Sequence, residues 1–356
     1  MVDGVRCMVM RGGTSKGVYF LRSDLPDDPT TRDDLLLQIM GTPDPRQIDG
    51  IGGAHPLTSK VAVVGPSAEL RADVEYLFLQ VGVDDPFVTD GQNCGNLLAG
   101  VAPFAIERGL VTTHGDIASV RIHMLNTGSI ATARIEMRDG LPQYRGDTAI
   151  SGVPGTGAPI RLDFEDIAGG SCGALLPTGR TVDEIAGVTC TLIDNGMPVV
   201  VTRAADLDVT GYESCRELEG NTGLRAALEE IRLEAGKAMH LGDVSATTVP
   251  KLTMVSPPRE GGTLCTRTFI PHRCHDAIGV LGAVSVATAA LLPGSPAAAL
   301  AEHDGGEVVT LEHPTGTFEA AIDLEIDGDG EPTVERAGII RTARKLMDGA
   351  VYPRGS

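Results

Sequence analysis

The chain has 356 residues, a formal net charge of −19 and a pI of about 4.7. This acidic balance excludes nucleic acid and anionic membranes as expected partners. The composition is 42% hydrophobic, which is enough for a large core, and the length indicates two domains at about 100–200 residues each.

The cysteines and the apolar runs indicate in which cellular compartment the protein is expected. Seven cysteines are an odd number, widely spaced and without a CxxC pair. We therefore expect a reduced cytoplasmic protein with no metal site. No signal peptide is recognisable, and no apolar run reaches the ~20 residues of a membrane helix. Residues 353–356 (PRGS) resemble the remnant of a protease cleavage site.

In chain order, each half of the sequence predicts strands, one long apolar helix and a β-hairpin. The strands are β-branched runs bounded by Gly, Pro, Asp and Asn. In the first half they are expected at 7–11, 59–64, 73–83, 120–125 and 129–137, with helices at 31–41 and 95–109. In the second half they are expected at 188–193, 198–202, 251–257, 264–270, 308–313 and 317–326, with helices at 216–236 and 276–291.

Four pairs of segments repeat in the same order, each offset by about 180–190 residues. The segment LTSKVAVVGPS resembles TVPKLTMVSPP, so that Lys60 falls on Lys251. The other pairs are 7–20 with 189–202, the apolar runs that begin at Cys94 and Cys274, and 123–140 with 311–328. We interpret this as a duplicated domain, with chance similarity among Gly- and Val-rich segments as the alternative.

The two long apolar helices carry almost no charge. A helix that is apolar on all sides is buried on all sides. The sequence therefore predicts an α/β protein of the α+β type, in which each domain curls a mostly antiparallel sheet around one central helix.

Both of these helices are expected to begin at a cysteine, Cys94 or Cys274. A helix start offers unpaired N–H groups and partial positive charge, which bind anions and lower the pKa of a thiol. The alternative for Cys94 is a small buried apolar residue. For Cys274 the neighbouring His275 is an equal candidate for the functional group.

Lys60 lies inside an otherwise apolar strand. Such a lysine either extends its amine to the surface or is desolvated and becomes a usable general base. The residues alone leave both interpretations open. Lys251 repeats the position but follows a proline, which favours an exposed side chain.

Two further segments concentrate possible ligand donors. The loop MRGGTSKG contains Arg11, Thr14 and Ser15, but it lacks the spacing of a phosphate-binding P-loop. It is either a tight turn or an anion site. The block FIPHRCHD contains His272, Arg273 and His275, which form either a carboxylate clamp or a surface patch.

Several of these segments together resemble the 2-methylaconitate isomerase family, in particular its members that act on 4-oxalomesaconate. The motifs are MRGGTSKG, QIDGIGGAHPLTSKVAVV, QNCGNLLAGVAPFAIERGLV, SCGALLPTG, IDNGMPVVV, FIPHRCHDAIGVLGAVSVATA and RTARKLMDG. They run in order over nearly the whole chain.

The resemblance implies a diaminopimelate epimerase-like fold with the active site between two similar domains. The first domain is expected at 1–152, with the C-terminal strand 346–352 returning to it, and the second at 153–345. In the family, a lysine and the first cysteine form the acid/base pair, which implies Lys60 and Cys94 as catalytic residues. Cys274 departs from the epimerase pattern because His275-Asp276 follows it, and this puts a two-cysteine racemisation in doubt.

The implied function is a cofactor-independent isomerase that moves a proton within 4-oxalomesaconate, in the breakdown of gallate or lignin-derived protocatechuate. The expected partner is a small unsaturated tricarboxylate, and a homodimer stays open. Expected substrate-binding residues are Arg11, Gly13, Thr14, Ser15, Ser59, Asn93, Gly95, Asn96, Met197, His272, Arg273 and His275. The alternatives are a 2-methylaconitate or methylitaconate isomerase, a non-catalytic tricarboxylate-binding accessory protein, and a thiol-dependent racemase that would need Cys274.

Overall fold

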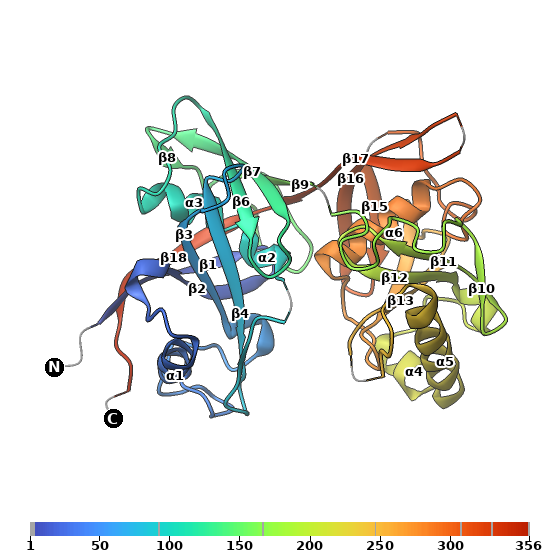
Figure 1. Ribbon diagram of the computed structural model, residues 1–356, viewed down its shortest axis with the longest axis horizontal. Helices are drawn as coiled ribbons and strands as arrows, with labels where there is room; N and C mark the ends of the chain where they lie inside the picture. The colour runs from blue at the N-terminus through green and yellow to red at the C-terminus, as the bar shows by residue number, and fades with distance from the viewer. Residues whose placement is uncertain are drawn as a thin grey trace. The chain divides into compact units, whose positions relative to one another are not determined.

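The structure is a computed structural model that describes residues 4–91, 93–165, 167–245, 247–306, 308–328 and 330–354. The chain forms two compact units (Figure 1). The first unit holds the chain up to Glu165 and again from Ile340 onward, and the second unit holds the chain between them.

The first unit is built on one sheet with the strand order β18-β1-β2-β3-β4-β6-β7-β9. Its elements are β1 (Val5–Gly12), β2 (Ser15–Leu21), η1 (Arg22–Asp24), α1 (Pro29–Met40), η2 (Pro56–Thr58), β3 (Lys60–Pro66), β4 (Val74–Val81), β5 (Val88–Thr89), α2 (Gly95–Leu98), α3 (Val101–Glu107), β6 (Ile117–Met124), β7 (Ile130–Arg138), β8 (Leu141–Pro142), β9 (Ile160–Glu165) and β18 (Ala343–Val351).

The second unit has the strand order β10-β11-β12-β13-β14-β15-β16-β17. Its elements are β10 (Asp183–Ile185), β11 (Val188–Asp194), β12 (Pro198–Arg203), η3 (Ala204–Leu207), α4 (Cys215–Gly220), α5 (Thr222–Ala238), β13 (Lys251–Ser256), β14 (Leu264–Phe269), α6 (Val280–Leu291), β15 (Val308–His313), β16 (Gly316–Ile326) and β17 (Pro332–Arg341).

The two sheets share one topology. In the first unit β2 runs parallel to β3, and β4 runs parallel to β6, while the other main neighbours are antiparallel. In the second unit the parallel pairs are β12 with β13 and β14 with β15, at the corresponding places. This confirms the duplicated domain and the mixed α/β fold class.

The division between the units differs from the expected boundary near residue 152. We expected strand β9 in the second domain, but it pairs antiparallel with β7 of the first unit. The change of unit therefore comes after Glu165. At the other end of the chain, β18 pairs with β1, and Figure 1 shows the two strands side by side.

Alternation along the strands gives each sheet two covered faces. In the first unit, one face packs with α1 into a core cluster that includes Leu36, Ile39, Val61, Val63, Leu79 and Val81. The opposite face of the same strands carries Ala62, Tyr76 and Phe78 and lies on the side of α2 and α3. We call this second face the inner face.

The second unit repeats this arrangement. Helix α5 packs on one face of the sheet in a cluster that includes Leu228, Ile231, Leu252 and Met254. Helix α6 lies against β11, β12, β15 and β16 (Figure 1), and every residue from Val280 to Ala290 is buried. The apolar run of the second half is thus a central helix, as predicted.

Three expected helices have other boundaries. The helix expected at 95–109 is divided into α2 and α3. Pro103 has no N–H group to donate to the carbonyl of Ala99. At the same break, Tyr19 packs against Gly100. The helix expected at 276–291 begins only at Val280, after Gly279 as its N-cap. The helix expected at 216–236 is two helices, α4 and α5, and the side chain of Asn221 caps the second.

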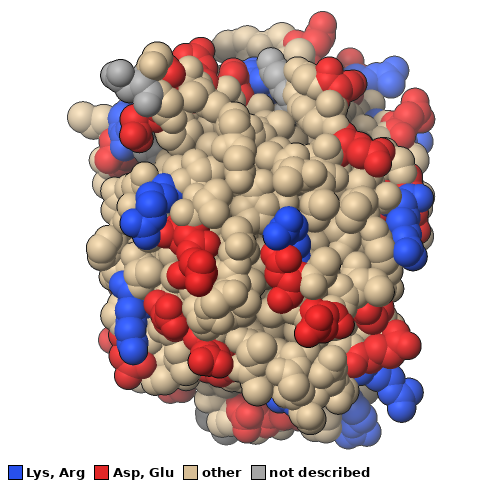
Figure 2. Space-filling view, turned by 90° about the vertical axis from the view of Figure 1, so that its right-hand side faces the viewer, with Lys and Arg blue, Asp and Glu red and all other residues tan. Residues whose placement is uncertain are grey.

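No helix in the described part of the chain is long and apolar enough to cross a membrane. On the face shown in Figure 2, acidic and basic side chains lie scattered among uncharged ones.

Candidate functional site

Lys60 is the first residue of β3 and the best-defined functional group of the first unit. Its side chain belongs to the inner face, and only 7% of the residue is exposed. The Nζ donates a hydrogen bond to Oε1 of Gln80 at 2.9 Å and lies 4.8 Å from the ring centroid of Phe78. Lys60 is therefore buried against neutral groups and does not extend to the surface, while its role as a general base stays a prediction.

Gln80 of β4 orients this amine. It is the cross-strand partner of Lys60 in the β3–β4 register. Its Nε2 donates to the backbone carbonyls of Ser59 at 2.9 Å and Pro56 at 3.1 Å. Because carbonyls can only accept, the amide nitrogen faces them and the amide oxygen faces Lys60.

Ser59 supports the site from a fully buried position. Its hydroxyl accepts a hydrogen bond from Nε2 of Gln47 at 2.8 Å, and the same nitrogen donates to Thr42 at 3.1 Å. With no exposed surface, Ser59 holds the segment that precedes Lys60. A direct contact of its side chain with substrate has no support in this geometry.

Cys94 is the N-cap of α2, and 8% of it is exposed. Its backbone carbonyl accepts a hydrogen bond from the hydroxyl of Tyr76 at 3.3 Å. Tyr76 and Phe78 are two residues apart on the inner face of β4, which is about 7 Å along a strand. Cys94 and Lys60 therefore both lie on the inner face of the sheet, Cys94 beside Tyr76 and Lys60 beside Phe78.

The expected placement of Cys94 at a helix start is thus correct, but the helix is short. The first N–H groups of any helix, here those of Gly95 and Asn96, have no partner within it. Helix α2 has only four residues, so its dipole is weaker than the long helix of the sequence-based prediction would have supplied. Stabilisation of an anion here rests on individual N–H groups.

Asn93, immediately before Cys94, shapes the backbone. Its Oδ1 accepts the N–H of Cys94 at 2.8 Å, and its Nδ2 lies 2.9 Å from the sulfur of Met124. Both ends of the amide are engaged within the protein.

The Gly-rich loop is the turn between β1 and β2, and it packs directly on α2. Gly13 has a φ of 51°, and a Cβ placed there would lie 2.1 Å from Oδ1 of Asn96. Asn96 in turn donates to the hydroxyl of Thr14 at 3.1 Å. Since the N–H of Gly13 already donates to Thr342, Gly13 contributes shape, while the hydroxyl proton of Thr14 stays available to donate.

Ser15 carries an unsatisfied group beside this turn. The residue is 1% exposed, and its Oγ has no hydrogen-bond partner within the described structure. It lies on the same face of β2 as Gly17, which packs against Leu97 of α2 and is the register partner of Lys60. A buried hydroxyl without a partner is costly and points to a ligand or water.

Arg11 ties the turn to the C-terminal segment. One guanidinium nitrogen donates to the carbonyls of Gly13 and Thr342, both at 2.8 Å. Burial and the neighbouring Arg344 lower the pKa of Arg11, which nevertheless stays a cation.

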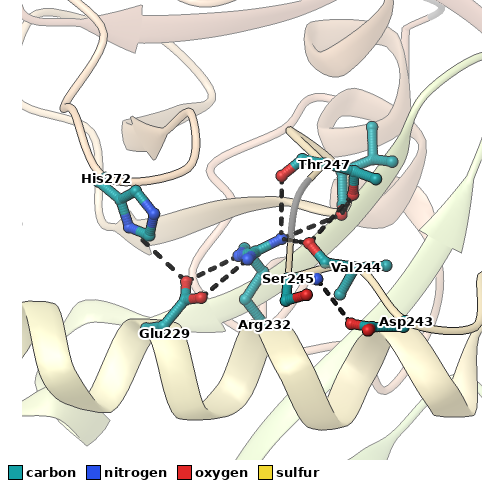
Figure 3. A network of polar contacts seen from close by, with 8 residues as sticks. Glu229, Arg232, Asp243, Val244, Ser245, Thr247 and His272 are labelled. Carbon is teal, nitrogen blue, oxygen red and sulfur yellow. Dashed lines mark hydrogen bonds and ion pairs between the residues drawn. The ribbon is translucent and has the colours of Figure 1, made fainter.

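Met197, His272, Arg273 and His275 belong to the second unit. Arg273 is exposed and forms an ion pair with Glu219 at 3.1 Å. His272 is also exposed, and its Nδ1 lies 3.7 Å from Glu229, which binds Arg232 as Figure 3 shows. Both side chains already lie beside carboxylates within their own unit.

Met197 and His275 have more enclosed places. Met197 is half-buried, and its backbone carbonyl accepts the hydroxyl of Ser285 at 2.7 Å. His275 is half-buried, and its Nδ1 accepts the N–H of Ala277 at 2.8 Å. Burial is the main cause that lowers the pKa of His275, so the ring is neutral near pH 7.

The expectation for Cys274 was wrong. It does not begin a helix, because α6 starts at Val280 and the turn at His275–Ala277 intervenes. Instead the backbone of Cys274 forms an isolated β-bridge with Phe269. The residue packs into the core cluster beneath α5 and is 7% exposed. Burial, followed by the nearby thiol of Cys215, raises its pKa, so Cys274 is a poor proton carrier.

In the described part of the chain, no group of three or more His, Cys, Asp or Glu side chains is arranged to hold a metal ion. Within the first unit the Gly-rich turn packs on α2, which begins after Cys94, and Lys60 lies on the inner face of the same sheet. Sequence reasoning missed Gln80, whose only signal was a polar residue in an otherwise apolar strand.

The fold is that of a protein of two similar units, and the first unit carries a buried lysine and a cysteine on its inner face. Residues 3–354 match the family described as PrpF protein, and the chain belongs to that family. It is 59% identical over 353 residues to the (4E)-oxalomesaconate Delta-isomerase of Novosphingobium sp. (strain KA1), covering 99% of this chain and 98% of that one.

A second relative, the 4-oxalomesaconate tautomerase of Pseudomonas putida, is 56% identical over 349 residues, covering 98% of this chain and 95% of that one. Among solved structures, the crystal structure of methylitaconate-delta-isomerase superimposes with a TM-score of 0.89 at 35% identity. That match covers 100% of this chain and 98% of the other.

Proposed function

We propose that this protein is a cofactor-independent isomerase that catalyses a 1,3-allylic proton shift, or the related keto–enol tautomerisation, in 4-oxalomesaconate. The observation that carries the proposal is the buried amine of Lys60, held by the neutral amide of Gln80 on the face where Cys94 begins α2. The names of two relatives at 59% and 56% identity support the choice of substrate.

Lys60 is the proposed general base. In its neutral form the amine removes a proton from the CH2 group that lies between the carbonyl and the alkene of the substrate. The C–H bond breaks, its electron pair passes into the conjugated system, and a dienolate forms. No electron acceptor is required, because the conjugated carbonyl takes up the charge.

The dienolate needs donors aimed at its oxygens. The free N–H groups at the start of α2 and the unpartnered hydroxyl of Ser15 supply them. The hydroxyl of Thr14 is a further donor, positioned by Asn96.

The reaction ends when a proton is returned. Delivery to the far carbon of the former alkene forms a new C–H bond and moves the double bond by one position. Cys94 is the proposed donor for this step, with Lys60 as the alternative. Delivery to oxygen instead gives the enol, so both outcomes share the first step.

A second candidate is isomerisation of methylitaconate or 2-methylaconitate. The solved methylitaconate-delta-isomerase, with a TM-score of 0.89, favours it as the alternative. A non-catalytic tricarboxylate-binding protein is the alternative of another class. For location, seven free cysteines support the cytoplasm, where thiols stay reduced.

One experiment tests these readings together. Proton NMR of the purified protein with 4-oxalomesaconate in deuterated water reports the product and the carbon that exchanges. We expect a new conjugated product with deuterium at the carbon that gains the proton. The absence of both product and exchange would indicate a non-catalytic binding protein. Turnover of methylitaconate alone would move the assignment to the second candidate.

A further inference from the structure

Lys251 occupies in the second unit the place that Lys60 occupies in the first. Each is the first residue of its strand, β13 or β3. Each is paired in register with the parallel strand before it, Lys251 with Val199 and Lys60 with Gly17. Because Leu252 packs toward α5, alternation directs Lys251 to the opposite face.

The two lysines differ in their partners. Lys60 donates to Gln80, its cross-strand partner, but the β13–β14 register begins at Leu252 and Phe269, one residue after Lys251. Among the described residues, none forms a hydrogen bond or ion pair with the Nζ of Lys251. The residue is half-buried, so an amine without a partner is unfavourable there.

The charge of Arg232, which acts on Lys251, does not compensate this amine. Arg232 is 1% exposed and directs its donors to the carboxylate of Glu229 and to the carbonyls of Val244, Thr247 and Val249 (Figure 3). Burial first, and the Arg232 charge second, lower the pKa of Lys251 to about 8. An anion beside Lys251 would relieve both effects.

His275 supplies a second donor in this neighbourhood. The N–H of His275 donates to the carbonyl of Thr268 at 2.8 Å, and Thr268 is the register partner of Thr253, two residues after Lys251 on β13. Since Nδ1 of His275 accepts the N–H of Ala277, the neutral ring carries its proton on Nε2. That N–H is available as a donor.

There is open space at the glycines that follow His275 in the chain. The loop after His275 leads into α6 through Gly279, its N-cap, and Gly282 follows in the first turn. A Cβ added at Gly279 or Gly282 would meet no atom within 4 Å.

We propose that Lys251 and His275 form a carboxylate-binding site in the second unit, in which the ammonium group supplies charge and the imidazole Nε2–H supplies direction. The ligand class, a polycarboxylate, rests on the proposed function. Lys251 is thus a binding residue, and its half-buried position corrects the expectation of an exposed side chain.

Calorimetric titration with tricarballylate tests the site. This saturated tricarboxylate has no alkene and cannot undergo the allylic shift. We expect Lys251→Met to weaken its binding by roughly tenfold to a hundredfold, the range for hydrogen bonds to charged groups. Lys251→Arg keeps the charge and should recover part of this loss. The control is Lys237→Met, on the exposed side of α5. Equal affinity of wild type and Lys251→Met would overturn the proposal.

Lysine NMR provides an independent measurement. The chain has only five lysines, so 13Cε-lysine labelling gives few signals, and the one lost in Lys251→Met belongs to Lys251. This signal should titrate near pH 8 in the free protein and at higher pH with saturating tricarballylate, because a bound anion favours the ammonium form. An unchanged titration on saturation would contradict a carboxylate at Lys251.

The two proposals fail separately. Turnover of 4-oxalomesaconate together with full tricarballylate affinity in Lys251→Met would overturn the second site and leave the isomerase standing. Conversely, Lys251-dependent binding of tricarballylate without any turnover would support the site and overturn the isomerase.

Discussion

The amine of Lys60 donates to the side-chain oxygen of Gln80 across two adjacent strands, at 2.9 Å. Gln80 cannot rotate its amide without losing its bonds to the carbonyls of Ser59 and Pro56. The partner of the lysine is therefore a fixed neutral acceptor. Unlike a carboxylate, it does not strongly favour the charged form of the amine, which suits a group that must both take up and release a proton.

Replacement of that acceptor by a carboxylate should change the pH dependence of turnover. In Gln80→Glu, a negative charge beside Lys60 favours the ammonium form over the neutral amine. The acidic limb of the kcat/KM profile should then move to higher pH. Gln80→Met, which removes the acceptor without adding charge, is the matched control and should lower kcat without this alkaline displacement. An acidic limb that stays in place in Gln80→Glu would exclude Lys60 as the titrating base.

Lys60→Met should abolish most turnover. Loss of a positioned general base typically costs about 10²–10⁴ in rate. The methionine keeps an unbranched apolar stem in place of that of the lysine, so the thermal unfolding midpoint should change little. Initial rates followed by ultraviolet absorbance of the conjugated product give the comparison, with circular dichroism as the control for folding. Near wild-type kcat in a folded Lys60→Met protein would rule out the base assignment.

Cys94→Ala separates the two proton transfers. If Cys94 returns the proton to the far carbon, Lys60 in the variant should still exchange the substrate CH2 protons with solvent, while the product is formed slowly. Deuterium incorporation into recovered substrate, measured by NMR, would show this. Loss of exchange and of product together would instead indicate that position 94 shapes the anion site. Cys94→Ser places a hydroxyl at the helix start in place of the thiol. It then reports whether a polar group at position 94 is sufficient for turnover.

The sequence predicted the repeated topology because each half carries long apolar runs in one order, and a buried pattern of that length leaves little choice of fold. It also drew attention to Lys60, a polar group inside an apolar run, and to Cys94 at the start of one, although only the family resemblance implied their catalytic roles. Gln80 is likewise a polar residue in an apolar strand. Its pairing with Lys60 depends on strand register, which a single strand does not encode.

The errors have a common physical cause. Cys274 was expected at a helix start because the apolar run begins there, but the run includes a turn closed by His275 and Ala277 before Gly279 caps the helix. Likewise, the first central helix is interrupted because Pro103 lacks an N–H group. Helix boundaries depend on capping residues and on single missing backbone N–H donors. Hydrophobic periodicity does not reveal either of them.

Gly13→Ala should destabilise the first unit, and the size of the effect should depend on Asn96. The added Cβ would lie 2.1 Å from Oδ1 of Asn96, at a backbone φ of 51° that costs a non-glycine residue about 1–2 kcal/mol. Asn96→Ala removes the clash but also the bond to Thr14. In urea unfolding, the double variant should be less destabilised than the sum of the two single changes. Strict additivity would show that the clash is relieved elsewhere.

Cys274→Ala distinguishes the isomerase from a thiol-dependent racemase, which would need one cysteine from each unit. Cys274 packs in the core cluster beneath α5, and its raised pKa keeps it protonated near neutrality. We therefore expect kcat within roughly threefold of wild type, together with a loss of about 1 kcal/mol in the free energy of unfolding from the vacated volume. Steady-state kinetics below the unfolding transition separate the two effects, and Cys94→Ala measured beside it gives the contrast. Loss of turnover in a fully folded Cys274→Ala protein would instead require a two-thiol mechanism. It would assign a proton transfer to the buried sulfur of Cys274, which its surroundings oppose.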